Sequence, residues 1–579
     1  MNFIKKQELY IKKVINEIGY EVEDVVLNKS SRPEFGEYQY NGAMNLAKIY
    51  HKNPKIIADE IVEKLKENKD YININVQGAG FINISFSNEA LIAYLNIIKD
   101  NIKINMNTYE KKKIFFDYGG ANVAKVLHVG HLRSANIGEA LKRLCNLIGY
   151  DTISDAHLGD FGRPLGLVIL EIKKRMPDLV YFDENYKGEY PNECPVTNDD
   201  LLEIYPYASN QAKKDEKYLE EARVITNEFQ NGNNRGYCAL LKQIVNVSVK
   251  EIKKIYLELN TTFDLWEGES DCYKYFEEML AFLKEKNVLV KSQGATVIEV
   301  KEKNENKPMP PLMVIRSNGS VAYESTDLAG IWERKKLYNP DEIWYFTDMR
   351  QTLHFEQLFR AAYKSGIVNT KTKLYYGGFG TMNGTDGKPF KTRDGGVMTL
   401  SNLLSIVKEE VDKITRSDII DDRDKVVEDI AIAALKYADL SPDVKNDYIF
   451  DLSKFCSMNG KTGPYLLYST IRIKSLLNKA DIINYKICDV YNEFDKNIIL
   501  IILEMPKVID NSLNNKTLSF ICDYLYRLSN VYNNFYNSNK ILTESDEKKK
   551  HSWITLSYIV YQINTLLLDV LSINIPKKM

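Results

Sequence analysis

The sequence predicts an α/β protein in which a parallel-sheet domain stands between a small N-terminal α+β domain and a C-terminal all-α helical bundle. Three observations lead to this prediction. A buried strand, a glycine-broken turn and a helix follow one another from Ile114 to Gly149. Apolar and polar residues alternate before that stretch, over 71–87. After about residue 401 glycine becomes scarce, and apolar residues recur at helical spacing.

The length and composition limit the classes of protein to which the chain can belong. A chain of 579 residues suggests three to four domains. The 77 basic and 79 acidic residues leave a net charge of −2, so a nucleic-acid partner would have to meet local basic patches. This balance alone slightly favours an enzyme acting on small molecules. The seven cysteines form no CxxC pair and fit reduced thiols. No run of about 18 apolar residues and no signal-peptide pattern occurs, so we expect a cytoplasmic protein that does not cross a membrane.

Residues 1–110 form the predicted α+β domain. Helical spacing marks residues 1–18 and 53–68, and Pro54 opens the second of these helices. The alternation over 71–87, on both sides of a Gly-Ala-Gly turn, predicts a β-hairpin. A lysine-rich linker follows at 111–113. Alone, this domain would be an unspecified binding module.

Residues 111–400 form the predicted Rossmann-type parallel-sheet domain. A strand at 114–118, the helix after His131 and a strand and turn at 151–162 predict a right-handed parallel crossover, with ligands bound beyond the carboxyl ends of the strands. Residues of about 175–240 are polar and irregular and are interpreted as a surface insertion that leads into helices. Further strands are expected at 295–300, 312–317 and 341–348, and a glycine-punctuated hairpin or loop at 373–400.

The remaining residues are predicted to be helical. Residues 401–454 form a helical connecting region, and 455–579 form a bundle of at least four helices. Apolar stripes at 519–536 and 554–573 support the bundle.

The first candidate site is His128-Val-Gly-His131, where the turn after the first parallel strand meets its helix. A helix N-terminus is positive and rich in donors, which suits a phosphate. The small Gly130 would let an adenine nucleotide such as ATP lie close to the backbone. The alternative is a metal pair, but no third ligand follows at the usual close spacing. The pattern therefore favours a nucleotide, and no metal site is predicted.

Two further groups of residues add to that site. Lys388, Lys391 and Arg393 lie on a glycine-hinged loop that could close over a pyrophosphate and stabilise charge on the leaving group, although a solvated basic hairpin is the alternative. Acidic, amide and phenol side chains also recur at predicted strand ends. Two carboxylates with such neighbours suit a cationic substrate, and an arginine side chain would use both. The group consists of Asp117, Asn122, Tyr323, Asp327 and Gln351.

At this point the motifs resemble those of a known family, the arginyl-tRNA synthetases of class I. His128-Val-Gly-His131-Leu-Arg-Ser134 is similar to that family's HIGH signature in its arginine-specific context. The resemblance continues through the rest of the chain in the right order. It includes the segments 157–162, 322–327, 348–354, 378–393, 435–441, 459–465 and 575–579.

The resemblance implies a reaction in two steps. ATP, as its Mg²⁺ complex, activates L-arginine to arginyl-adenylate, and the adenylate passes arginine to the 3′ end of tRNA. His128, Gly130 and His131 would hold ATP, and the second group above, with His128, would bind arginine. Lys125 would supply the charge that the 388–393 loop lacks, because that loop departs from the plain KMSK signature. The family also implies that the N-terminal domain contacts the tRNA elbow and the bundle the anticodon, with no tightly bound metal, and we expect a monomer.

The sequence departs from the family pattern at a few positions. Ala121 stands where proline is usual, and Phe161 replaces a tryptophan. Thr326 replaces the arginine that usually precedes Asp327, so a salt bridge at that position is not expected.

Three alternatives stay open. A class I synthetase for cysteine or glutamate would share the two histidines and the basic loop, but would lack the pocket with two carboxylates and the N-terminal hairpin domain. A small adenylyltransferase would not need the long helical tail. A non-catalytic tRNA-binding homologue would be indicated by loss of His128 or His131, and both are present.

Overall fold

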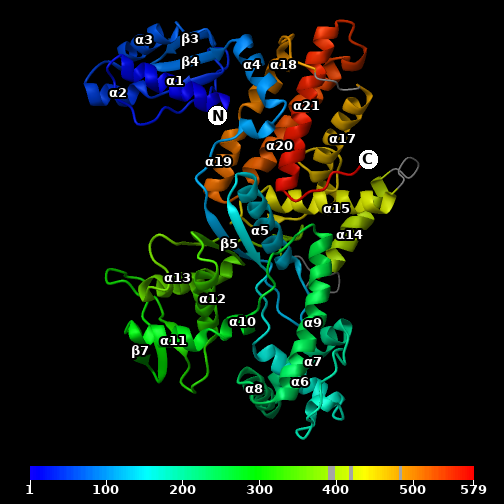
Figure 1. Ribbon diagram of the computed structural model, residues 1–579. Coiled ribbons are helices and arrows are strands. Elements are labelled where there is room, and N and C mark those ends of the chain that lie inside the picture. The colour runs from blue at the N-terminus through cyan, green and yellow to red at the C-terminus, as the bar shows by residue number, and fades with distance from the viewer. Residues whose placement is uncertain (389–397, 416–421, 481–484) are drawn as a thin grey trace.

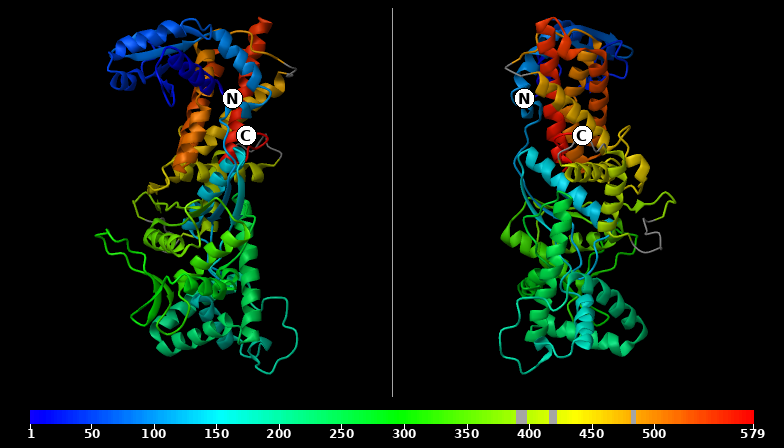
Figure 2. Two further views of the ribbon diagram at one scale, coloured as in Figure 1. Left: turned by 60° about the vertical axis from the view of Figure 1, so that its left-hand side comes forward. Right: turned by 90° about the vertical axis from the view of Figure 1, so that its right-hand side faces the viewer.

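The computed structural model describes residues 1–388, 398–415, 422–480 and 485–579. The molecule is elongated (Figure 1). The N-terminal domain and the C-terminal bundle lie side by side at one end, and the helices of residues 163–258 lie at the other (Figure 2). Strand β5 (Lys113–Tyr118) and helix α5 (Val129–Leu147) occupy the middle.

The N-terminal domain is built on an antiparallel sheet with the strand order β1-β2-β4-β3. The predicted hairpin is confirmed, since β3 and β4 pair across a turn in which Gly78 and Gly80 both have positive φ. Asn53 caps α3, and Pro54 takes the first turn, where its missing N–H costs nothing. The elements are α1 (Phe3–Glu17), β1 (Asn28–Lys29), β2 (Tyr38–Tyr40), α2 (Ala43–Tyr50), α3 (Pro54–Leu65), β3 (Tyr71–Gln77), β4 (Phe81–Phe86), α4 (Asn88–Ile98) and η1 (Ile102–Asn105).

The predicted α/β class is confirmed by a four-stranded parallel sheet with the order β11-β10-β5-β6. Strand β5 is central, and its residues from Ile114 to Tyr118 are all buried, as expected for a strand covered on both faces. Its carboxyl end lies beside that of β10, where Asp117 is the partner of Tyr345. The other strands are β6 (Asp151–Asp155), β10 (Glu342–Phe346) and β11 (Lys373–Tyr376).

Two strand predictions differ from the structure in their pairing. The segments at 295–300 and 312–317 are strands, but β7 (Leu289–Ser292), β8 (Ala295–Ile298) and β9 (Leu312–Ile315) form a separate antiparallel sheet. The hairpin or loop expected from 373 is wrong at its start, because β11 is an edge strand of the parallel sheet. Further on, β12 (Met382–Asn383) pairs with the distant β13 (Tyr448–Ile449). A short apolar run next to glycines looks the same in a hairpin arm and in a parallel edge strand.

The segment expected to be irregular over about 175–240 is largely helical. Only residues 176–197 lack a long helix, and α7 begins at Asn198 behind a reciprocal cap between Thr197 and Asp200. The helices of this part are α6 (Arg163–Arg175), η2 (Val180–Phe182), α7 (Asn198–Lys214), α8 (Glu216–Gln230) and α9 (Arg235–Glu258). The helices that follow are α10 (Glu269–Tyr273), α11 (Phe276–Glu285), α12 (Tyr323–Leu337), η3 (Met349–Gln351) and α13 (Thr352–Ser365).

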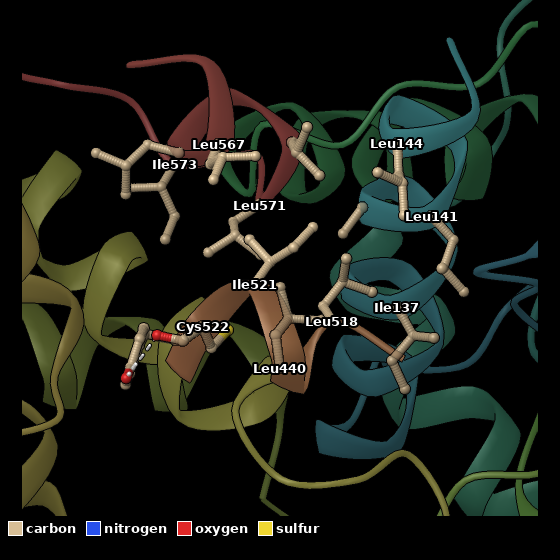
Figure 3. Packing of buried hydrophobic residues seen from close by; sticks show 14 of the residues in the cluster. Ile137, Leu141, Leu144, Leu440, Leu518, Ile521, Cys522, Leu567, Leu571 and Ile573 are labelled. Carbon is tan, nitrogen blue, oxygen red and sulfur yellow. Dashed lines mark hydrogen bonds between the residues drawn. The ribbon is translucent and has the colours of Figure 1, made fainter. Parts of the chain in front are cut away.

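The C-terminal part is helical, as predicted, and it packs directly on α5. Ile137, Leu141 and Leu144 of α5 face Leu440 of α15, residues at the start of α20, and the end of α21 (Figure 3). Helix α5 therefore belongs to the parallel sheet and to the bundle at once. The helices are α14 (Leu400–Ile414), α15 (Arg423–Leu440), α16 (Leu452–Phe455), α17 (Gly463–Lys479), α18 (Glu493–Ile502), α19 (Met505–Asn515), α20 (Ser519–Ser538), η4 (Ile541–Thr543) and α21 (Glu547–Val570).

Within the described ranges, none of these helices combines the length and the apolar character needed to span a membrane.

Candidate active site

The two histidines of the predicted nucleotide site cap the N-terminus of α5. His128 is the N-cap residue, and its Nδ1 accepts a hydrogen bond from the backbone N–H of Gly130 at 3.1 Å. The Nδ1 of His131 accepts the backbone N–H of His128 at 3.0 Å. A Cβ on Gly130 would lie 2.9 Å from Cε1 of His128, so the glycine is needed for this arrangement. Because each Nδ1 acts as an acceptor, each neutral ring carries its proton on Nε2.

Both rings are neutral near pH 7. Burial lowers the pKa of His131 to about 3, and the charge of His128 acts in the same direction. Desolvation also lowers the pKa of His128, with contributions from the charges of Arg350 and Lys125. Two neutral N–H donors at a helix N-terminus can bind phosphate oxygens without a change of protonation.

The loop between β5 and α5 is held by the long helix α9. The hydroxyl of Tyr256 donates to the carbonyl of Gly119 at 2.6 Å. The N–H of Ala124 donates to Oγ of Ser248 at 3.2 Å. Ala124 has a φ of 60°, a left-handed conformation that is rare for a residue with a side chain. These contacts could not be predicted from the sequence, because α9 follows the loop by more than a hundred residues.

The neighbouring loop residues face different partners. Asn122 is exposed and forms a bridge with Gly159, where a Cβ would approach its Oδ1 to 2.6 Å. The ammonium group of Lys125 lies 4.9 Å from the centre of the Tyr205 ring on α7.

Asp117, at the end of β5, is buried and paired with a cation of the chain itself. Its Oδ2 lies 2.8 Å from a guanidinium nitrogen of Arg334 on α12, and the same nitrogen lies 3.2 Å from Asp155 at the end of β6. Burial raises the pKa of Asp117, and the charge of Arg334 opposes that rise. Arg334 was not predicted from the sequence, because it lies in the last turn of α12 in a run of basic residues, where a solvated side chain is expected. A carboxylate has room for further donors, so this pairing leaves Asp117 able to bind a second guanidinium.

Asp327 and Tyr323 lie on the first turns of α12. The carboxylate of Asp327 is 2.6 Å from Nε2 of His354 on α13. Burial lowers the pKa of His354, but the hydrogen bond and the charge of Asp327 raise it further than burial lowers it. The Tyr323 ring, 48% exposed, lies 5.7 Å from the His354 ring. The orientation of the Asp327 carboxylate is therefore held by a histidine of α13.

Glu269, the first residue of α10, joins this pocket and was missed by the sequence analysis. Burial raises its pKa to about 7, with a further contribution from the charge of Asp327. The charge of Asp327 raises the pKa of Tyr323, and burial and the charges of Glu269, Asp117 and Glu324 act in the same direction, so these carboxylates share the neighbourhood of the phenol. Among the described residues Glu269 forms no ion pair. The only signal in the sequence is the short run Glu267-Gly-Glu269, which is too common to single out.

The segment after β10 lies next to the histidines. Arg350 is paired with Asp348 at 2.7 Å, and both side chains affect the pKa of His128. Gln351 is exposed, and its Oε1 accepts a hydrogen bond from Thr347 at 3.2 Å.

The described residues that follow the basic loop lie beside the histidine turn. The N–H of Leu400 donates to the carbonyl of Leu127 at 2.8 Å, and His128 forms a bridge with Thr399. Lys388 is exposed, and its carbonyl accepts the N–H of Gly384 at 2.8 Å. Lys391 and Arg393 fall outside the described residues.

The structure thus places Asp117, Tyr323 and Asp327 in one acidic neighbourhood. His128 and His131 lie nearby, since Lys125 influences the pKa values of both histidines and of Glu269. Lys388 makes no side-chain contact with either group within the described ranges. Among the residues that the structure describes, no group of three His, Cys, Asp or Glu side chains lies close enough together to hold a metal ion.

The chain matches three family models in sequence order. Residues 92–452 match the model described as tRNA synthetases class I (R), catalytic domain. Residues 5–86 match the arginyl tRNA synthetase N terminal domain, and residues 466–579 match the DALR anticodon binding domain.

Curated proteins and solved structures agree with these matches. An arginine–tRNA ligase of Alkaliphilus oremlandii is 43% identical over 584 residues, covering 100% of this chain and 99% of that protein. One of Francisella tularensis subsp. novicida is 42% identical over 577 residues and 98% of each chain. The arginyl-tRNA synthetase structure of Plasmodium falciparum has a TM-score of 0.80 at 24% identity, and covers 100% of this chain and 99% of that one. That of Thermus thermophilus has a TM-score of 0.79 at 19% identity, with 100% of both chains covered, and like the first it supports the fold.

Proposed function

The chain belongs to the arginyl-tRNA synthetase family, and from this premise we propose which of its residues carry out the reaction. The enzyme activates L-arginine with ATP and transfers the arginine to its tRNA, with release of AMP and pyrophosphate. One observation supports the assignment of the site most strongly. The charges of Asp117, Glu269 and Asp327 all act on the phenol of Tyr323, and Lys125 acts on Glu269 and on both capping histidines. Three carboxylates in one neighbourhood suit a guanidinium group beside a phosphate site.

We propose that arginine is bound by Asp117, Tyr323 and Asp327, as expected from the sequence, together with Glu269. The carboxylates neutralise the guanidinium, and the phenol of Tyr323 closes the pocket on its exposed side. Asn122 and Gln351 are exposed at neighbouring strand ends, and their amides suit the polar atoms at the other end of the amino acid. His128 would lie between the two substrates.

We propose that His128, Gly130 and His131 hold ATP, which arrives with Mg²⁺ as part of the substrate. An oxygen of the arginine carboxylate attacks the α-phosphorus, the bond to the bridging oxygen breaks, and pyrophosphate leaves. The neutral Nε2–H groups donate to phosphate oxygens where charge develops. Lys125, Lys388, Lys391 and Arg393 would stabilise the charge on the departing pyrophosphate.

The domain division follows from the same premise. We propose that residues 1–110 contact the elbow of the tRNA and that 455–579 read its anticodon, with 111–400 as the catalytic domain and 401–454 as the connection. We also propose a monomer that works in the cytoplasm, because the parts needed for both steps lie in one chain.

The test is ATP–pyrophosphate exchange driven by arginine, measured with and without tRNA. We expect exchange with arginine in the presence of tRNA, and none with cysteine or glutamate. Exchange driven by cysteine or glutamate but not by arginine would refute the specificity. No exchange in any arm that contains tRNA would favour a non-catalytic tRNA-binding protein.

A further inference from the structure

The contact between Lys125 and Tyr205 links the nucleotide site to a distant helix. The ammonium group lies 4.9 Å from the centre of the Tyr205 ring, within the range of a cation–π interaction. Among the residues that the structure describes, the ring is the one partner of this ammonium, which forms no ion pair and no side-chain hydrogen bond. A lysine that serves only to stabilise the fold would be expected to pair with a carboxylate, and the ammonium group of Lys125 contacts a ring instead.

The backbone next to Lys125 is also held by a helix of this group, α9. Ala124, immediately before it, has a left-handed φ of 60° and donates its N–H to Ser248 of α9. Tyr205 lies on α7, which packs with α8 and α9 in the group of helices at the far end of the molecule (Figure 1). The backbone of the lysine and its charged end are therefore both held by helices that follow the loop in sequence.

We propose that Tyr205 is a positioning residue for Lys125, and that its ring holds the ammonium beside the histidine turn before ATP arrives. This inference rests on the proposed role of Lys125 in the activation step. A lysine has a long flexible stem, and a charge that is already placed loses less freedom when the reaction begins. Lys125 influences both histidines, so the held position lies within reach of the phosphate site.

A purely structural role for Tyr205 is the competing explanation. Tyr205 is half-buried and follows Ile204, which belongs to the buried face of α7 with Leu201 and Ala208. Loss of packing would lower the stability of the protein and weaken every step of the reaction. Loss of positioning would lower kcat for adenylate formation, while leaving the KM for arginine and the transfer of arginine from preformed adenylate to tRNA unchanged.

The first experiment compares Tyr205→Leu, Tyr205→Phe and Tyr207→Leu. Tyr207 lies on the same helix, is 47% exposed, and contacts the guanidinium of Arg175 at 5.3 Å, so it is a matched aromatic control. We expect Tyr205→Leu to lower kcat for adenylate formation by roughly ten-fold, the size of effect expected for one such contact. Tyr205→Phe keeps the ring and should remain near wild type, as should Tyr207→Leu.

The second experiment is a double-mutant cycle with Lys125→Ala. If Tyr205 acts through Lys125, Tyr205→Leu has no further effect on adenylate formation in the Lys125→Ala protein. Additive losses in the cycle, or equal losses in Tyr205→Leu and Tyr205→Phe, would overturn the positioning role even if Tyr205→Leu is less stable. Normal adenylate formation by Lys125→Ala would instead overturn the proposed role of Lys125. A slow Lys125→Ala protein beside a normal Tyr205→Leu protein would overturn the inference about Tyr205 alone.

Discussion

Nε of Arg133 lies 2.9 Å from Oδ1 of Asp439, and both side chains are buried. The pair joins the first turns of α5 to α15. The guanidinium of Arg133 also donates to the carbonyls of Gly380 and Asn446, at 2.6 and 3.1 Å. The side chain of Arg133 thus connects α5, which the two histidines cap, to the segment at Gly380 that precedes the basic loop and to the connecting region around Asp439 and Asn446.

Removal of Asp439 should be costly for stability. Asp439→Ala leaves the buried Arg133 without its counter-charge, which typically costs about 3–5 kcal/mol. The matched control is Glu278→Ala, which breaks the pair of Glu278 with Lys336 at 2.6 Å, where both side chains are nearly half exposed. That change should cost no more than about 1 kcal/mol. Thermal unfolding of the two variants checks this, and equal losses would contradict the importance of the buried pair.

The helix cap and the proposed phosphate contact of His128 can be separated by His128→Asn. Asparagine is a good N-cap residue, so α5 should keep its cap, and the stability should change by less than about 1 kcal/mol. The Nε2–H donor is lost, and removal of one preorganised donor typically costs about 10²–10³-fold in kcat. Pyrophosphate exchange and thermal unfolding measure the two effects. A variant with unchanged exchange would show that His128 only caps the helix.

The sequence was sufficient to predict those elements of the fold that depend on the local pattern of residues. The strand at 114–118, the capped helix after it and the position of Asp117 at the strand end follow from the spacing of apolar, glycine and polar residues. Tyr323 and Asp327, which were expected at a strand end, lie instead on the first turns of α12. The resemblance assigned Asp117, Asn122, Tyr323, Asp327 and Gln351, with His128, to arginine. The structure places Asp117 and Asp327 near Tyr323, and the binding of arginine by this group stays a prediction.

What the sequence did not reveal depends on contacts between distant segments. Arg334 and Glu269 have no distinctive neighbours in the sequence, and only the folded chain brings them to the pocket. Strand β11 was interpreted as part of a hairpin or loop, because its place at the edge of the parallel sheet depends on pairing with β10 and not on its own residues. The helices α7 and α8 were not recognised in the polar segment for a similar reason, since their narrow apolar faces are buried only when they pack against α6, α9 and each other.

The pair of His157 and Asp155 predicts a loss of stability at alkaline pH. Burial and the charge of Arg334 would lower the pKa of His157, but the hydrogen bond to Asp155, 3.3 Å away, and the charges of Asp155 and Asp117 together raise it to about 9. The ordinary value in an unfolded chain is about 6.5. The stabilisation is therefore complete below about pH 6.5 and is lost as the pH rises to about 9, by on the order of 2–3 kcal/mol.

Thermal midpoints of the wild type and His157→Gln, measured from pH 6 to pH 9.5, test this prediction. The difference between the two proteins should be largest at the acid end and shrink toward the alkaline end. A difference that stays constant across this range would mean that His157 is not protonated in the folded protein.

Glu269 predicts that the affinity for arginine depends on pH near neutrality. Its pKa is raised to about 7 by burial and by the charge of Asp327, so the free enzyme is partly protonated there. A bound guanidinium favours the carboxylate and lowers that pKa, so binding releases a proton. The affinity should therefore rise as the pH increases from about 6 to about 8, and level off above the pKa of the free enzyme.

Glu269→Gln should bind arginine more weakly at pH 8 and lose this dependence on pH, while Glu267→Gln, two residues earlier, serves as the control. Calorimetric titration with arginine in two buffers of different ionisation enthalpy measures the proton release directly. A wild-type enzyme that releases no proton at pH 7, or a Glu269→Gln protein that keeps the same pH profile, would remove Glu269 from the arginine pocket.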